Sequence, residues 1–140
     1  MRSAIPKLQV DRRNRTKSGS VAAELAAILP LLTLITFGSI QVANTIHFKQ
    51  ALTSAAFEGT RLATGATANR QQIEDRVQAM LDARRVVGAE ISITPAGELR
   101  QLPTGTQIDI SVSAPTASNV TGPSFVLFTN TITATGRTIR

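Results

Sequence analysis

The chain has 140 residues, enough for one modest domain. It contains no Cys, which excludes a disulfide framework, a thiolate metal site and a cysteine nucleophile. It also contains no Trp or Tyr, so five Phe are the only aromatic residues, and a stacking surface for single-stranded nucleic acid is not expected. The net charge of +6 is concentrated near the N-terminus, because residues 1–19 hold six bases and one acid, whereas the chain from Lys49 onward holds nine bases and seven acids.

A long apolar segment follows the basic tail. Residues 25–48 contain no Asp, Glu, Lys or Arg across 24 positions, and about 20 such residues in a helix cross the hydrocarbon core of a bilayer. A buried core helix fits poorly, because the rest of the chain is too short to surround it. A cleaved secretory signal also fits poorly, because its apolar region is about 7–15 residues long. We therefore predict a membrane span, with the basic tail in the cytoplasm and the C-terminal part outside.

Polar residues mark the second half of this span. Gln41 and Asn44 are three positions apart and share a helix face, where they could hydrogen-bond to a partner helix. Alternatively, both lie near the outer interface and meet water. Pro30 lies in the first half, where neighbouring helices can satisfy the carbonyl that it leaves free.

Helical patterning continues beyond the membrane. Small residues recur at every fourth position, at Ala51, Ala55, Gly59 and Ala63. Such a stripe lets another helix backbone approach closely. Glu58 and Arg61 are three apart and can pair across one turn. Gly65 and its neighbouring threonines predict a break after this helix.

A second helix is predicted after the break. Asn69 offers an N-cap, and Gln72 follows three residues later, which is a capping pattern. The apolar face of this helix consists of Ile73, Val77, Met80 and Leu81. Gly88 is the expected stop.

The hydrophobic period changes to two in the last third of the chain. Alternation predicts strands at residues 91–93 and 108–112, and β propensity predicts a third at residues 130–137. Pro and Gly mark turns at residues 95–97 and 103–105, and residues 114–123 have the composition of a loop. The predicted fold class is α+β: a long N-terminal transmembrane helix continues into a small extracytoplasmic domain with a second helix and a short antiparallel sheet.

No constellation of catalytic residues is evident in the sequence. His47 is the only histidine, so it cannot form a His-based metal site alone, and its place at the end of the apolar span suggests an interfacial residue. Glu74 and Asp75 are adjacent on a helix and point apart, and Asp109 falls on the solvent face of a strand. A glycine-rich phosphate loop is missing. We therefore expect no enzymatic activity, no cofactor and no metal.

One carboxylate stands out of place. Glu24 lies at the start of the apolar segment. A charge at mid-membrane costs about 2.5–3.5 kcal/mol on insertion scales, and less near an interface. Glu24 is therefore expected either to have a charged partner or to reach water at the cytoplasmic boundary.

The surroundings of Glu24 resemble a known processing site. Residues 19–25 read Gly-Ser-Val-Ala-Ala-Glu-Leu, between the basic tail and the long apolar helix. This arrangement is similar to the prepilin peptidase site of the type IV pilin superfamily, in which cleavage follows the Gly and a Glu is the fifth residue of the mature chain. Gly19, Ser20 and Glu24 fit that spacing.

A second block, just beyond the span, resembles the TadE-like family of pseudopilins, whose pattern there is roughly Q-A-L-x-x-A-A-x-E-G-A-R-x-A. The residues that match are Gln50, Ala51, Ala55, Ala56, Glu58, Gly59 and Arg61. The resemblance implies a basic cytoplasmic leader at residues 1–18, a transmembrane helix with a processing site at residues 19–48, and an extracytoplasmic TadE-like α+β domain at residues 49–140.

The resemblance implies a structural role, as a minor pseudopilin-like assembly component of a tight-adherence (Tad) type, or type IVb, pilus or a related secretion apparatus in the bacterial inner membrane. The implied partners are a prepilin peptidase, other pilins or pseudopilins, Tad inner-membrane components and the lipid bilayer, with no nucleic acid. Glu24 would pair with the free amine at Ser20 of a neighbouring subunit and set subunit register. The alternative is an uncleaved single-pass binding module that docks other envelope proteins.

Overall fold

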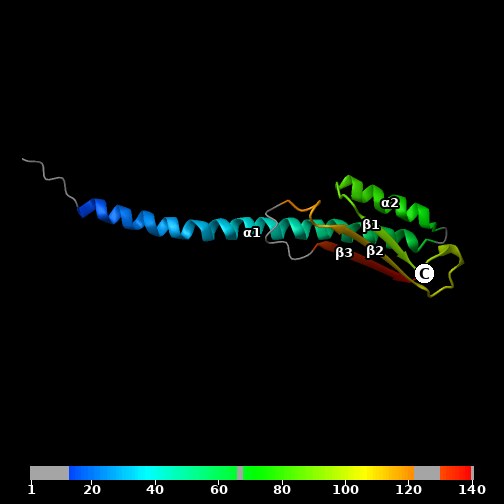
Figure 1. Ribbon diagram of the computed structural model, residues 1–140. Helices are drawn as coiled ribbons and strands as arrows, with labels where there is room; N and C mark the ends of the chain where they lie inside the picture. Colours follow the sequence, from blue (N-terminus) through cyan, green and yellow to red (C-terminus); the bar gives the residue numbers. More distant parts are fainter. Residues whose placement is uncertain (1–12, 66–67, 122–129, 140) are drawn as a thin grey trace, which may run out of the picture. The chain divides into compact units, whose positions relative to one another are not determined.

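The computed structural model describes residues 13–65, 68–121 and 130–139 (Figure 1). Among these residues there are two α-helices, α1 at Arg13–Ala63 and α2 at Arg70–Ala83. Three strands follow, β1 at Glu90–Thr94, β2 at Gln107–Pro115 and β3 at Thr131–Ile139, with a short 3-10 helix, η1, at Leu99–Gln101. The predicted α+β class, with a long helix, a second helix and an antiparallel sheet, is confirmed.

Two compact units divide the chain, Met1–Thr36 and Phe37–Arg140, and α1 contributes to both. The division falls inside the predicted span of residues 19–48. The division marks where the chain begins to pack on itself, and it does not mark the edge of a membrane.

The described part of the first unit is helical and uncovered. From Gly19 to Thr36 every residue is exposed, and α1 continues through Pro30. Within the described residues, one helix is long and apolar enough to cross a membrane, and it lies in Gly19–Ala63. A helix with apolar side chains exposed all round requires lipid or other helices around it. This arrangement fits a single-pass membrane protein.

The second unit contains an antiparallel sheet in the order β1-β2-β3. Ile110 of the central strand lies opposite Ile93 on one side and Gly136 on the other. Burial alternates along β2 and β3, as the period of two predicts. The predicted loop at residues 114–123 is wrong at its start, because Ala114 is buried and pairs with Ile132 in the sheet. Residues 122 and 123 of that loop lie outside the described residues.

Helix α2 begins as predicted. The Asn69 side chain accepts a hydrogen bond from the backbone N–H of Gln71 at 3.1 Å, which satisfies one of the free donors of the first turn. Ile73, Val77 and Leu81 are buried, so the predicted apolar face points into the core.

The predicted stop of α2 at Gly88 is wrong, because the helix ends at Ala83. Arg85 adopts the left-handed conformation with φ 57°, although this region favours glycine. Its N–H donates to Asp82 O at 2.9 Å, and the N–H of Val86 donates to Leu81 O at 3.0 Å. These two bonds form a Schellman cap, and the buried side chain of Val86 supplies the apolar contact that accompanies this motif.

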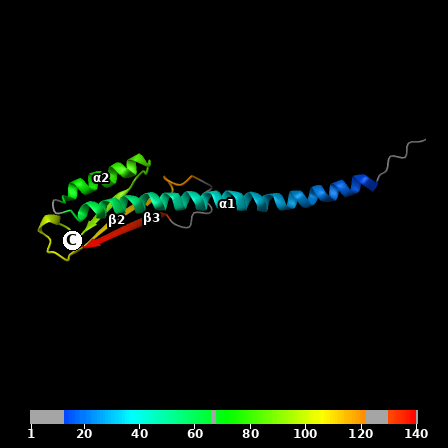
Figure 2. The ribbon, with the colours of Figure 1, turned by 180° about the vertical axis from the view of Figure 1, so that it is seen from behind.

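In the second unit the α1 ribbon runs beside α2 and the three strands (Figure 2). The buried core residues come from all of these elements, and those of α1 are mostly small. A β-carbon on Gly59 would lie 2.9 Å from a methyl group of Val77 in α2 and 3.1 Å from one of Ile110 in β2. A β-carbon on Gly136 of β3 would lie 2.7 Å from the Thr60 methyl and 2.9 Å from the Ala56 carbonyl oxygen. The small-residue stripe predicted for contact with another helix is therefore occupied by elements of the same chain.

We predict that Gly136→Ala destabilises the second unit by about 1–3 kcal/mol, because the added methyl group overpacks a contact that includes rigid helix backbone. Thermal unfolding of the full-length protein in detergent measures the effect. Gly38→Ala is the matched control, since a β-carbon added at Gly38 would meet no atom within 4 Å. Equal unfolding temperatures for the two variants would contradict the close packing.

Candidate functional site

The residues of the second sequence block divide between the core and the surface of the second unit. Buried members are the small residues Ala51, Ala55, Ala56 and Gly59. Gln50 and Arg61 are exposed, and Glu58 is half-buried. The small residues allow close packing within the chain, whereas the polar residues remain available at the surface.

Glu58 is the centre of a polar cluster that joins the two helices. Arg61 donates from Nε and Nη2 to the two carboxylate oxygens, at 2.9 and 2.8 Å. This two-pronged geometry is the strong form of an arginine–carboxylate pair. The predicted pairing of Glu58 with Arg61 is confirmed. Arg76 of α2, which the sequence did not indicate, approaches the same carboxylate at 3.5 Å.

Arg61 stabilises the ionised form of the Glu58 carboxylate. The hydrogen bond from Arg61 lowers the pKa of Glu58 from its ordinary value of 4.5, and Glu58 in turn raises the pKa of Arg61. Because Arg76 belongs to α2, the ionised carboxylate also links α2 to α1. Among the described residues, no three His, Asp or Glu side chains gather closely enough to hold a metal ion.

Gln41 and Asn44, the polar residues in the second half of the predicted span, lie in two different environments. The Asn44 amide donates to the Thr121 carbonyl at 3.0 Å, so it is bonded within the chain. Gln41 is only 2% exposed, so it does not meet water as one of the two predictions required. Its side-chain oxygen and nitrogen are buried without a hydrogen-bond partner among the described residues.

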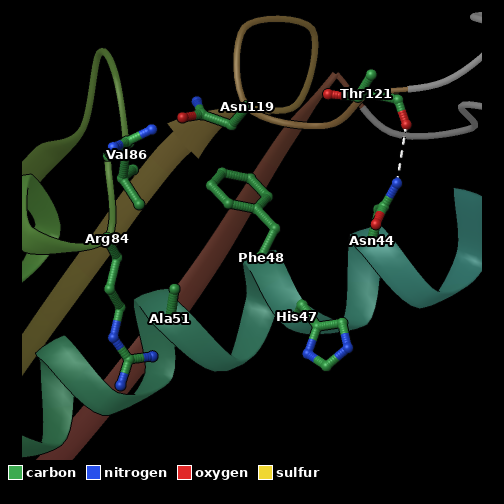
Figure 3. Close-up of a pocket in the computed structure, with 9 residues that line it drawn as sticks. Asn44, His47, Phe48, Ala51, Arg84, Val86, Asn119 and Thr121 are labelled. Atoms are coloured by element: carbon green, nitrogen blue, oxygen red, sulfur yellow. Dashed lines mark hydrogen bonds between the residues drawn. The ribbon is translucent and has the colours of Figure 1, made fainter.

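His47 lines a cavity of about 550 Å³ at the end of the apolar segment (Figure 3). The lining residues are Asn44, His47, Phe48, Ala51, Arg84, Arg85, Val86, Asn119 and Thr121. The amide of Asn119 accepts from the Val87 N–H at 2.7 Å and donates to the Val87 carbonyl at 2.8 Å. This pair of bonds fixes the chain after α2 to the loop after β2, which forms one wall of the cavity.

The residues of the predicted processing site lie in the first unit. Gly19, Ser20 and Glu24 are exposed residues of α1. No ion pair joins Glu24 to another residue in the described part of the chain. Their predicted roles require other molecules, the peptidase and a second subunit, and they stay predictions.

We predict that the polar cluster makes the second unit sensitive to acid. A lowered pKa means that the stabilisation is fully present above pH 4.5 and is lost as pH falls through the folded-state pKa. Thermal unfolding of the full-length protein between about pH 3 and 6 should therefore show a shallower pH dependence for Glu58→Gln than for the wild type. Glu98→Gln, at an exposed carboxylate, is the control. The same slope in wild type and Glu58→Gln would contradict this role.

Comparison with known families identifies one segment of the chain. Residues 19–61 match the family model described as TadE-like protein, a range that includes both sequence blocks discussed above. No curated protein and no solved structure matches the chain significantly. The predicted resemblance is confirmed: residues 19–61 are a TadE-like segment.

Proposed function

We propose that this protein is a minor pseudopilin-like structural component of a Tad-type pilus or a related secretion apparatus, and not an enzyme. The TadE-like segment at residues 19–61 carries this proposal, because it suggests a component associated with the Tad pilus. The exposed apolar part of α1 supports it, since a helix of this kind must be surrounded by lipid or by other helices.

The burial of residues along α1 suggests that the two parts of the TadE-like segment make different contacts. After Ala51 the small residues of α1 are covered by α2 and the sheet of the same chain. Between Gly19 and Phe37 every residue is exposed. We propose that this earlier part is where neighbouring subunits pack, and that the later part carries a domain on the extracytoplasmic side. The basic tail supports this orientation.

Glu24 is the proposed registration residue. It is a carboxylate directly before a segment that is free of charge from Leu25 to Phe48, and no described residue of its own chain neutralises it. A carboxylate near hydrocarbon is stabilised by an opposite charge. Cleavage after Gly19 would create an amine at Ser20, about one helical turn before Glu24. That amine on a neighbouring subunit is the proposed partner.

We predict that the mature protein begins at Ser20 in cells with an active prepilin peptidase, and that Gly19→Leu blocks the cut. Mass spectrometry of the N-terminal peptide from purified protein measures both. Gly38→Leu is the control, since it adds the same side chain elsewhere in α1. Recovery of only full-length wild-type protein favours the alternative, an uncleaved membrane module that docks envelope proteins.

We predict that Glu24→Val leaves membrane abundance normal and abolishes assembly. On insertion cost alone, the change favours the membrane by up to about 3 kcal/mol and should harm nothing. On the pairing proposal, the neighbouring amine loses its counter-charge. Membrane abundance is measured together with co-purification of pilus components.

Thr33→Val serves as the control for Glu24→Val, because it also makes an exposed position of α1 more apolar but removes no charge. It should leave both abundance and assembly unchanged. Normal assembly of the Glu24→Val protein would exclude a registration role.

A further inference from the structure

Basic side chains gather where the exposed apolar surface of α1 ends. Ile46 is the last of the large exposed apolar residues before His47 and Lys49, both of which are exposed. Arg84 and Arg85, from the end of α2, are exposed as well and line the cavity that contains His47. Four cationic or titratable basic residues, far apart in sequence, therefore surround the C-terminal boundary of the apolar segment.

Arg84 belongs to two cavities. The first, of about 550 Å³, contains His47 and Arg85. The second, of about 520 Å³, is lined by Ile46, Lys49, Gln50, Thr53, Ser54 and Arg84. In Figure 3 the Arg84 side chain extends from the end of α2 toward the α1 turn that carries Ala51, while the Phe48 ring projects toward Asn119. The two cavities thus flank one guanidinium group.

Neither cavity contains an acid that could neutralise this charge. No Asp or Glu lines either of them. Four carboxylates of the described chain have side-chain partners elsewhere: Glu58 with Arg61, Asp75 with Gln71, Asp82 with Gln78 and Asp109 with Arg137. Within the described chain, Arg84, Arg85 and Lys49 form no ion pair. The site therefore has an excess of positive charge and favours an anion.

The end of α2 accounts for only part of this arrangement. Basic residues are favoured at a helix C-terminus by its negative dipole. The last carbonyls are, however, already bonded to the N–H groups of Arg85 and Val86. Arg85 also holds the left-handed conformation of the cap, which favours glycine, so the charged side chain stands at a position where its residue type is not the favoured one.

We propose that these two cavities bind the phosphate of an anionic phospholipid. The lining combines Arg84, Arg85 and Lys49, which form no ion pair with another described residue, with Ile46, which is exposed and lies in the apolar segment. A lipid phosphate contacts Arg84 together with Arg85 in the first cavity, or Arg84 together with Lys49 in the second, while its acyl chains run along the apolar side of α1. Because the site lies at the end of the span, the occupant is an amphiphile of the bilayer. This inference does not depend on the assembly role of the protein.

The test uses the full-length protein in vesicles of phosphatidylcholine that contain a minority of phosphatidylglycerol. After gentle extraction, native mass spectrometry measures the ratio of the two lipids retained on the protein. The wild type should enrich phosphatidylglycerol over the bulk mixture. Arg84→Gln/Arg85→Gln should reduce this enrichment about five-fold per arginine, as expected for basic groups close to an anionic surface.

A matched double variant, Arg100→Gln/Arg137→Gln, loses the same charge at residues that line neither cavity, and it should retain the enrichment. Arg85→Gly separates loss of charge from loss of folding, because glycine adopts the left-handed conformation without strain while the charge is removed. It should unfold at or above the wild-type temperature and still lose enrichment.

Two results would overturn the proposal. One is equal retention of phosphatidylglycerol by the wild type, Arg85→Gly and the cavity double variant. The other is binding of soluble glycerophosphate at the same residues without any preference for phosphatidylglycerol in vesicles, which would assign the site to a free anion.

Discussion

The close approach of a β-sheet to a helix backbone governs the second unit of this protein. Gly136 of β3 has room only for hydrogen where it faces Thr60 and Ala56 of α1. Gly59 has the same restriction where it faces Val77 and Ile110. Interiors of this density tolerate neither voids nor added volume. The residues in this part of the TadE-like segment are therefore small because α1 packs closely against the sheet and α2 of the same chain.

This packing determines what the rest of α1 can do. A helix face that packs against the sheet of its own chain cannot also contact a neighbouring subunit. The earlier part of α1 is not covered in this way, and among its described residues Glu24 is the single carboxylate. Beyond the packed face, the Glu58 cluster ties α2 to α1 through Arg61 and Arg76. The TadE-like segment thus combines an apolar helix that is long enough to cross a membrane with the helix face on which the sheet and α2 pack.

Elements specified by local pattern could be predicted from the sequence. The alternation through Ile108 and Ile110 predicted β2, and Asn69 predicted the start of α2. Features that depend on distant contacts could not be predicted. Helix α2 ends before Arg85 because Val86 caps it against the core, and β2 extends to Pro115 because β3 pairs with it.

The polar sites show the same division. Pairing between Glu58 and Arg61 is local and was predictable from their spacing, whereas Arg76 arrives from another helix. His47 had no partner that the sequence could indicate, and only the fold brings Arg84 to the cavity that His47 lines.

The most direct test of the close helix–sheet packing is the nuclear Overhauser contact between the Thr60 methyl and the Gly136 α-protons, measured on full-length protein in micelles with mixed isotope labels. The account predicts a strong contact within one chain; its absence, or its appearance only between chains, would contradict the packing on which everything else depends.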